Sequence, residues 1–343
     1  MAARGRSGTL SYDARMVAAN PDSDAPVPPI QTHDDGVVAI DTMTGSMTSV
    51  TAGYLLAAPR PALIECGPAR TIDHLLSGLR SLGMDPDDLA FVVLTHIHLD
   101  HAGGAGNVAE AFPNATVVVS DMGARHMHDP SRLNASAKQV YGDLYEPVYG
   151  DCTPIDQGRL LAVADGDEID LGGGRTLTAM YTPGHAKHHI GLLDSDTGAL
   201  FSGDSVGVKL PGMKWLRPAT PPADFHLEAA LHSIERYRQA EPSRVYLAHY
   251  GPVDPPADAL AEADERLRLW AATAEAAWHE STELDHVAET LRARFESEID
   301  ASSVADDPDA VGRLELLSGI RSNAAGLVRY FTRRDEGTLT EVG

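Results

Sequence analysis

The stretch 95-THIHLDHAGG-104 follows directly on the apolar run 90-AFVVL-94, which predicts a buried strand. The loop after that strand carries four side chains of types that bind metals: His96, His98, Asp100 and His101. Two histidines spaced two apart can turn to one side of extended backbone, and the two glycines that follow allow a tight turn. Imidazole plus carboxylate is a ligand set that suits zinc, manganese or iron rather than calcium.

Three later stretches repeat this arrangement, in which a metal-binding residue type ends an apolar run beside a glycine. They are 182-TPGH-185, 202-SGD-204 and 248-AHYG-251. The side chains that they present are His185, Asp204 and His249. Loops at strand ends are where active sites gather on α/β scaffolds, so we expect these residues to meet the 96–101 loop.

The remaining pattern predicts the α/β fold class. Strand-like segments lie near 36–40, 53–58, 61–67, 115–120, 175–182, 189–194, 199–204 and 244–251. Helical periodicity marks residues 71–82, 105–112 and 226–240, and residues 121–160 are expected to be loop or short helix.

We expect four segments along the chain. Residues 1–35, rich in proline and aspartate near their end, are expected to be poorly ordered. Residues 36–255 form the expected catalytic domain. Residues 256–335 read as a helical C-terminal region, with helices at 258–280, 284–296 and 309–333, and residues 336–343 as a tail.

The composition limits the kinds of partner. The formal net charge is −23, and basic charge is mostly arginine. A surface this negative repels nucleic acid and anionic lipid, so we expect a small-molecule substrate and neither a nucleic-acid nor a membrane partner. The sequence leaves open whether the chain forms a homodimer. The acidity also suggests a halophilic source, although a GC-rich genome would equally replace lysine with arginine.

Compartment follows from what the sequence lacks. No run of 18 apolar residues and no export signal are visible, and the two cysteines, Cys66 and Cys152, form no C-x-x-C pattern. We therefore expect a cytoplasmic protein in which both cysteines are small buried residues.

The motifs THIHLDHAGG, TPGH, SGD and AHYG occur in the order and rough spacing of a known family. Over residues 36–255 the chain resembles the metallo-β-lactamase-fold hydrolases, most closely their glyoxalase II-like branch. The resemblance implies a four-layer αβ/βα sandwich with two metals at one edge of two facing sheets. It also implies that the C-terminal helices correspond to the extra helices of glyoxalase II-type enzymes.

The resemblance assigns a ligand role to each of the seven residues. His96, His98 and His185 would hold the first metal, and Asp100, His101 and His249 the second. Asp204 would bridge the two ions, and with Asp100 it is the carboxylate expected to act in catalysis. The ions are expected to be two divalent cations, zinc first, with iron or manganese as alternatives.

Two metals about 3.5–4 Å apart can share a water and lower its pKa toward neutrality. The sequence therefore predicts a metal-dependent hydrolase of a small ester, thioester or lactone that uses a metal-bridging hydroxide. No G-x-S-x-G motif signals a serine nucleophile. Two alternatives remain: an iron-dependent persulfide dioxygenase and a non-catalytic binding protein on the same fold.

Several family members are disfavoured. Only about 45 residues separate Asp204 from His249, too few for the extra domain of the RNA-processing members. His98 stands where the flavin-linked diiron members carry glutamate, and a secreted β-lactamase would carry an export signal. The basic residues that bind glutathione in glyoxalase II cannot be matched to this chain.

One departure from the family pattern is Glu65-Cys66-Gly67 in place of Asp-Thr-Gly. The acid normally supports the metal-binding loop without binding metal, and we expect glutamate to keep that role.

Other candidate residues carry less specific signals. His189 is expected to pack as an ordinary structural residue, with a supporting role beside the metals as the alternative. Residues 207–222 are open between a loop and a lid over the metals. Tyr141, Tyr145 and Tyr149 could be a packed stripe or a substrate wall, and His126 and His128 are expected on the surface or a pocket wall.

Overall fold

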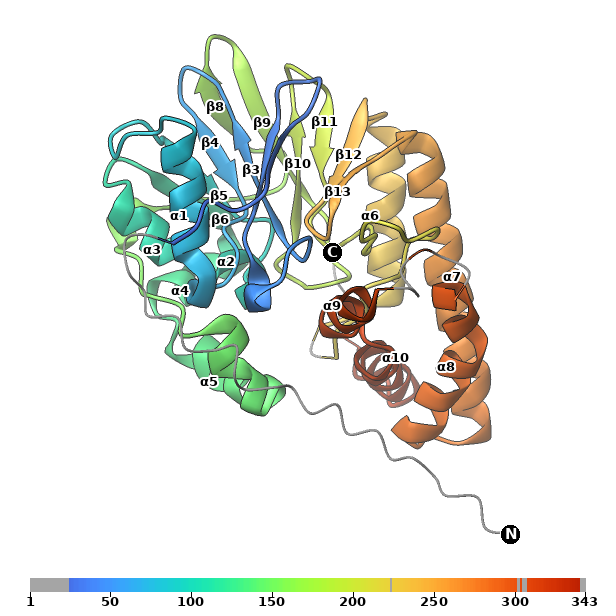
Figure 1. The fold of residues 1–343 in the computed structure, drawn as a ribbon. Helices are drawn as coiled ribbons and strands as arrows, with labels where there is room; N and C mark the ends of the chain where they lie inside the picture. Colours follow the sequence, from blue (N-terminus) through green and yellow to red (C-terminus); the bar gives the residue numbers. More distant parts are fainter. Residues whose placement is uncertain (1–24, 223, 301–302, 304–306, 340–343) are drawn as a thin grey trace.

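The computed structural model describes residues 25–222, 224–300, 303 and 307–339. Two mixed β-sheets face each other at the centre of the molecule, and helices cover their outer faces (Figure 1). This is the four-layer αβ/βα sandwich that the resemblance implied, so the expected fold class is confirmed.

The first sheet contains seven strands in sequence order. They are β1 (Ile30–Thr32), β2 (Val38–Asp41), β3 (Ala52–Leu56), β4 (Ala62–Ile64), β5 (Phe91–Val93), β6 (Thr116–Ser120) and β7 (Leu160–Val163). The first four pair antiparallel, and β4 to β7 pair parallel. Strand β5 is apolar throughout because both faces of this sheet are covered, as is typical of parallel strands.

The second sheet contains six strands in the order β13-β12-β11-β10-β9-β8. They are β8 (Glu168–Gly172), β9 (Arg175–Tyr181), β10 (Ile190–Asp194), β11 (Ala199–Phe201), β12 (Arg244–Leu247) and β13 (Gly251–Val253). Because β11 and β12 are parallel and β9, β10 and β11 alternate in direction, β9, β11 and β12 all end at one edge of the sheet.

Aromatic rings fill the space between the sheets. Tyr54 lies 5.4 Å from Phe201 and 5.1 Å from Tyr246, measured between ring centroids, and Phe201 stacks on Tyr246. All three are essentially buried. Offset and edge-on ring contacts of this kind add to the free energy of burying apolar area, so they hold the two sheets together.

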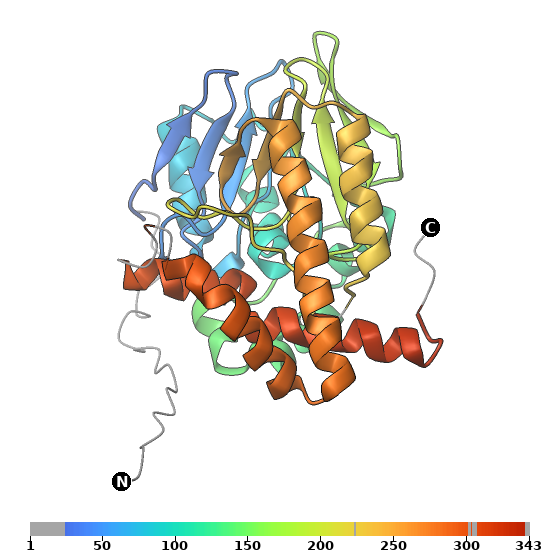
Figure 2. The same cartoon turned by 90° about the vertical axis from the view of Figure 1, so that its right-hand side faces the viewer.

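Helices α1 (Ile72–Ser81), α3 (Ala105–Ala111) and α4 (Asp121–His128) cover the first sheet, and α6 (Leu227–Gln239) and α7 (Pro256–Glu280) cover the second (Figures 1 and 2). Helix α1 buries Leu75 and Leu79, the apolar face that its 3.6-residue period predicted. Short helices complete this part: α2 (Leu99–Ala102), α5 (Ser131–Tyr141), η2 (Thr44–Ser46), η3 (Ala69–Thr71), η4 (Gly142–Leu144), η5 (Tyr145–Tyr149) and η6 (Gln157–Arg159).

Helix α7 is longer than the sheet that it covers and runs past its edge (Figure 2). There it packs against α8 (Leu284–Asp300) and α10 (Ile320–Asp335), with Trp270 stacked 4.4 Å from Phe295, while α9 (Pro308–Ser318) precedes α10. Helices α7, α8 and α10 share one apolar core with the second sheet. No helix in the described part of the chain is both long and apolar enough to cross a bilayer.

The expected single helix over 309–333 is wrong, because it is two helices that meet at Gly319. This glycine has extended backbone (φ −59°, ψ 141°), and a Cβ on it would lie 2.5 Å from the Glu315 carbonyl oxygen. The sequence pattern missed the break because the apolar period continues across it.

The N-terminal expectation also needs correction. Within the segment 1–35, residues 30–32 form β1 and pair with β2, while residues 1–24 lie outside the described part. Strands β7 and β8 were not predicted either. In β8, 168-EIDLG-172, buried and exposed residues alternate at the end of the sheet, and so short an alternation was not recognised.

Replacing Asp194 with asparagine is expected to lower the free energy of unfolding by about 3 kcal/mol, because it leaves the Arg175 guanidinium with half of its partner. The fully buried Asp194 accepts from Arg175 Nε at 2.8 Å and Nη2 at 2.6 Å, and from Thr197 Oγ1 at 2.6 Å. Burial opposes its ionisation, but Arg175 and Thr197 outweigh it and hold its pKa below the usual value.

The sign of the pH dependence follows. A carboxyl with a lowered pKa stabilises the fold above the pKa of the unfolded chain and loses this effect as the pH falls through the folded value. Urea unfolding should therefore give a constant difference between Asp194→Asn and wild type above pH 5, shrinking below pH 4. Asp196→Asn is the control, because Asp196 is 67% exposed and lies 3.8 Å from the same arginine. It should change the free energy of unfolding little at any pH. A pH-independent difference would contradict the assignment.

Candidate metal centre

The seven residues expected as ligands come together at one edge of the sandwich. They lie on the segments that follow β5, β9, β11 and β12. The two sheets are tied there by the Ile190 N–H, which donates to the Thr95 carbonyl at 2.8 Å. The residues that meet are His96, His98, Asp100, His101, His185, Asp204 and His249.

Three histidines form the first group. Nδ1 of His98 lies 3.0 Å from Nε2 of His96 and 3.0 Å from Nε2 of His185. His98 therefore presents its Nδ1 nitrogen where the other two present Nε2. The two-residue spacing in 96-HIH-98 brings both rings to one point, as the sequence predicted.

Asp100, His101 and His249 form the second group. Nε2 of His101 lies 3.1 Å from Nε2 of His249, and Oδ2 of Asp100 lies 3.6 Å and 3.5 Å from these two nitrogens. Asp100 and His101 sit in the single turn of α2, which begins directly after His98. That change from extended to helical backbone turns them away from the first group and toward His249.

Asp204 lies between the groups, with one carboxylate oxygen toward each. Its Oδ2 is 3.5 Å from Nε2 of His185 in the first group. Its Oδ1 is 3.4 Å from Nε2 of His101 and 3.3 Å from Nε2 of His249 in the second. Asp204 follows β11 and is 5% exposed.

The donor set fits metal ions. Nitrogens bound to a tetrahedral zinc at about 2.0–2.1 Å would lie roughly 3.3 Å apart, close to the 3.0–3.1 Å separations seen here. Oδ1 of Asp204 is buried without a hydrogen-bond partner, and imidazole nitrogens face one another. A cation between these atoms would satisfy them all.

The outer nitrogens of three histidines have partners of their own. Nδ1 of His249 lies 2.7 Å from the Val50 carbonyl, and Nδ1 of His185 lies 3.1 Å from the Ala219 carbonyl. Nδ1 of His96 lies 3.0 Å from the Thr95 hydroxyl. A carbonyl can only accept, so His185 and His249 donate from Nδ1, which leaves Nε2 as the nitrogen directed at the ligand groups.

The electrostatics of the two groups differ. In the first, burial lowers the pKa of His96 and His98 and brings that of His185 to about 4, so these rings are neutral donors at pH 7. In the second, burial opposes the charge on His249, but Asp204 and Asp100 outweigh it and raise its pKa to about 9. A cation bound there would displace that proton.

Comparison with known proteins identifies the family. Residues 54–249 match the model of the metallo-beta-lactamase superfamily. The chain belongs to this superfamily. A metallo-beta-lactamase fold-containing protein from Sulfurisphaera tokodaii is 36% identical over 172 residues, which cover 49% of this chain and 63% of that protein. Its crystal structure superposes with a TM-score of 0.57 and 28% identity, covering 71% of this chain and 87% of that chain.

Two other superfamily relatives have named activities. The N-acyl homoserine lactonase of Agrobacterium fabrum is 34% identical over 115 residues, or 34% of this chain and 39% of the lactonase. The hydroxyacylglutathione hydrolase of a Synechococcus strain is 26% identical over 201 residues, or 57% of this chain and 62% of that enzyme. This chain therefore aligns with less than two thirds of each of these relatives.

Glu65, where the superfamily pattern has aspartate, is buried beside the ligands. Its Oε1 accepts from the Thr95 hydroxyl and lies 3.6 Å from Nδ1 of His101. The residue has a positive φ of 62°, so the backbone bends sharply to aim the carboxylate at the loop. This position agrees with the supporting role expected for it, although Glu65, His96 and His101 also form a group that could hold an ion.

The other histidines and the two cysteines singled out in the sequence lie beside or away from the seven candidate ligands. Nε2 of His189 accepts from the Asp204 N–H at 3.3 Å, which supports the supporting role considered for it rather than packing alone. His188, to which no role was given, stacks on His96 with ring centroids 6.2 Å apart. His126 and His128 lie on α4 in none of the groups that could hold a metal among the described residues. Cys66 and Cys152 are buried and free, as expected.

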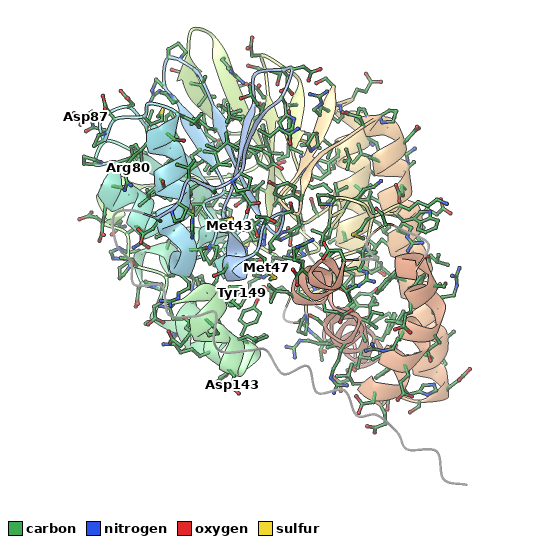
Figure 3. All side chains as sticks on the ribbon, viewed as in Figure 1. Met43, Met47, Arg80, Asp87, Asp143 and Tyr149 are labelled. Atoms are coloured by element: carbon green, nitrogen blue, oxygen red, sulfur yellow. The ribbon has the colours of Figure 1, made fainter. Side chains whose placement is uncertain are left out.

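Two of the three tyrosines considered as a packed stripe, Tyr145 and Tyr149, are buried. Tyr145 is packed inside and donates to Asp151 at 2.7 Å. Tyr149 lies near Met43 and Met47 at the lower edge of the sandwich, between α5 and α9 (Figure 3). The partly buried Tyr141 ring lies tilted against the Tyr149 ring, with centroids 4.2 Å apart. Burial, together with the nearby Asp100, raises the pKa of both phenols.

Residues 207–222, named here the strap, do not form a free lid. Residues 216–218 and 220 are buried, and Val208 and Arg217 pair as an isolated antiparallel bridge. Arg217 Nη1 donates to the Ser318 carbonyl at 3.1 Å, and the Ala219 carbonyl meets His185. The roles of the Val50 and Ala219 carbonyls could not be predicted from the sequence, because a backbone acceptor has no residue-type signature.

Proposed function

We propose that this chain is a dinuclear metal-dependent hydrolase of a small ester, thioester or lactone. The observation that carries the proposal is Asp204, whose two carboxylate oxygens face different ligand groups at 3.3–3.5 Å. A carboxylate in this position can join two ions into one centre. Zinc is the metal favoured by three imidazoles in one group, with iron or manganese as alternatives.

When bound, two divalent ions would activate a water as nucleophile and polarise the acyl oxygen of the substrate. The chain's own residues set the geometry for this. Asp204 and Asp100 supply negative charge that offsets the charge of the cations. The backbone N–H of Asp204 donates to Nε2 of His189, which holds this part of the backbone in place. The buried aromatic and aliphatic surroundings keep the local dielectric low, which strengthens these interactions.

Two features support an acyl substrate. The relatives with named activities include a lactonase and a hydroxyacylglutathione hydrolase, which act on an ester-type and a thioester-type bond. The partly exposed side chains of Met43, Met47 and Tyr141 are suited to contact an apolar acyl chain. We also propose that the chain belongs to the glyoxalase II-like branch of the superfamily and that it acts in the cytoplasm.

Metal analysis followed by a substrate panel tests the function. Purified protein should contain two divalent ions per chain, zinc first, and should hydrolyse at least one member of a panel of lactones, small esters and acyl thioesters. It should leave bis-p-nitrophenyl phosphate, a phosphodiester, essentially uncut. A single bound iron with oxygen consumption on glutathione persulfide would favour the dioxygenase instead. Absence of bound metal after reconstitution would favour a non-catalytic binding protein.

Salt should stabilise the protein if its acidity reflects a halophilic source, as we propose. The net charge of −23 makes the folded surface repel itself, and added ions screen that repulsion. The midpoint of thermal unfolding is expected to rise by about 5 °C or more between dilute buffer and molar KCl. A matched series in sucrose, which is uncharged, separates screening from solute exclusion. Equal midpoints with and without KCl would contradict the proposal.

A further inference from the structure

We infer that Asn323, on α10, positions the metal-facing histidine His185 through a single peptide unit of the strap. The inference rests on the proposed metal role of His185. It gives the C-terminal helices a task in the metal centre itself, because the residue that holds the ligand lies 138 positions beyond it in the sequence.

The peptide bond between Ala219 and Thr220 is the connecting element. Its carbonyl accepts from Nδ1 of His185 at 3.1 Å. Its N–H donates to Oδ1 of Asn323 at 2.8 Å. Because a peptide unit is planar, fixing the N–H end fixes the direction of the carbonyl end. Hydrogen bonds in such a chain also polarise and strengthen one another.

Asn323 grips the strap at further points. Its Nδ2 donates to the Pro218 carbonyl at 3.0 Å, and the Thr220 hydroxyl donates to Oδ1 at 3.0 Å and to the Asn323 carbonyl at 3.0 Å. Ser318 Oγ accepts from Nδ2 at 2.8 Å and donates to the same Pro218 carbonyl at 2.7 Å. Both ends of the side-chain amide are therefore used.

The chemistry of the amide explains why asparagine suits this position. It is 2% exposed, so every polar atom of the side chain must find a partner inside the protein. The primary amide offers an acceptor to the Thr220 N–H and, at the same time, a donor to the Pro218 carbonyl. An apolar side chain would leave the Thr220 N–H unpaired and the peptide free to rotate away from His185.

The first measurement uses wild-type protein without metal. In ¹⁵N-histidine-labelled protein, assigned with a His185→Gln variant, His185 should carry its proton on Nδ1. The amide of Thr220 should exchange slowly with solvent. A proton on Nε2 of His185 would overturn the inference, whether or not the protein is a hydrolase.

The second measurement uses Asn323→Leu, similar in size and without hydrogen-bonding groups, and Asn323→Ala should the leucine variant not fold. Each is expected to lose the single Nδ1-protonated form of His185. The affinity for the ion at His96, His98 and His185 should fall about tenfold, measured by competition with a chelator. The Co²⁺-loaded protein should also show a changed visible spectrum.

Tyr330→Phe is the matched control. It removes a partly buried hydrogen bond from Tyr330 to Glu228, on the same helix and two turns away from Asn323. Its metal affinity and His185 signal should equal those of wild type. Equal losses in this control would mean that general loosening of α10 is responsible, and an unchanged Asn323→Leu would equally overturn the inference. Failure of wild type to bind metal would instead overturn the proposed function, leaving the metal-free test of Asn323 intact.

Discussion

Replacing Asp204 with alanine is expected to abolish hydrolysis and to lower the metal content from two ions per chain to one or fewer. The reason is that this carboxylate faces both ligand groups, at 3.5 Å from His185 and 3.3 Å from His249. Its removal takes a ligand from each site and leaves two buried cations without the charge between them. We expect kcat/KM to fall at least about a thousandfold.

The measurement combines elemental analysis of the purified variant with kinetics on the substrate that the panel identifies. Asp143→Ala is the control, because Asp143 is exposed on η4 and lies near the same end of the molecule (Figure 3). It should keep both ions and full activity. Unchanged turnover in Asp204→Ala would refute the proposed hydrolase. Lost activity with both ions retained would mean that Asp204 acts on the substrate without bridging the metals.

Replacing Gly184 with alanine is expected to produce the largest loss of stability. Gly184 directly precedes His185 and has φ of 135°. A Cβ on it would lie 2.3 Å from the backbone N and Cα atoms of Ala230 in α6. The TPGH turn and helix α6 are also joined by a hydrogen bond from the His226 N–H to the Gly184 carbonyl, at 2.9 Å. Moving them apart to relieve the clash would break this hydrogen bond. We expect a cost above about 3 kcal/mol in urea unfolding of the metal-free protein.

Gly166→Ala separates the clash from the backbone conformation. Gly166 also has a positive φ, of 83°, but an added Cβ there meets no atom within 4 Å. It should cost only the left-handed penalty of about 1–2 kcal/mol. If Gly184→Ala cost no more than this control, the close approach of the TPGH turn to α6 would be wrong. Loss of metal affinity in Gly184→Ala alone would further tie that turn to the position of His185.

The candidate ligands are the part of the site that could best be predicted from the sequence. The histidines and aspartates could be selected because each has a side chain of a metal-binding type at the end of an apolar run. Strand periodicity places such loops at sheet edges, and the order of the motifs matched one superfamily. Helices 226–240 and 71–82 were likewise visible, since a 3.6-residue apolar period is a local property that needs no knowledge of the partner.

The sequence failed where local pattern and tertiary contact disagree. The break at Gly319 lies within a continuous apolar stripe, and only the close approach of Glu315 makes glycine necessary there. From the sequence alone the strap can be interpreted as a lid, because it follows Asp204 closely and holds two of the four lysines with Trp215. Its burial is decided by α7, α9 and α10, which lie later in the chain.

The sequence by itself determined which residue types can bind metal, that they follow buried strands, and that the chain folds as an α/β sandwich. Tertiary structure decided that the two oxygens of Asp204 face different groups, that the Val50 and Ala219 carbonyls orient two histidines, and that Asn323 holds the second of these carbonyls. The physical reason is that a side chain's identity is written locally. The direction in which it points depends on backbone groups that carry no identity and that are brought close only by folding.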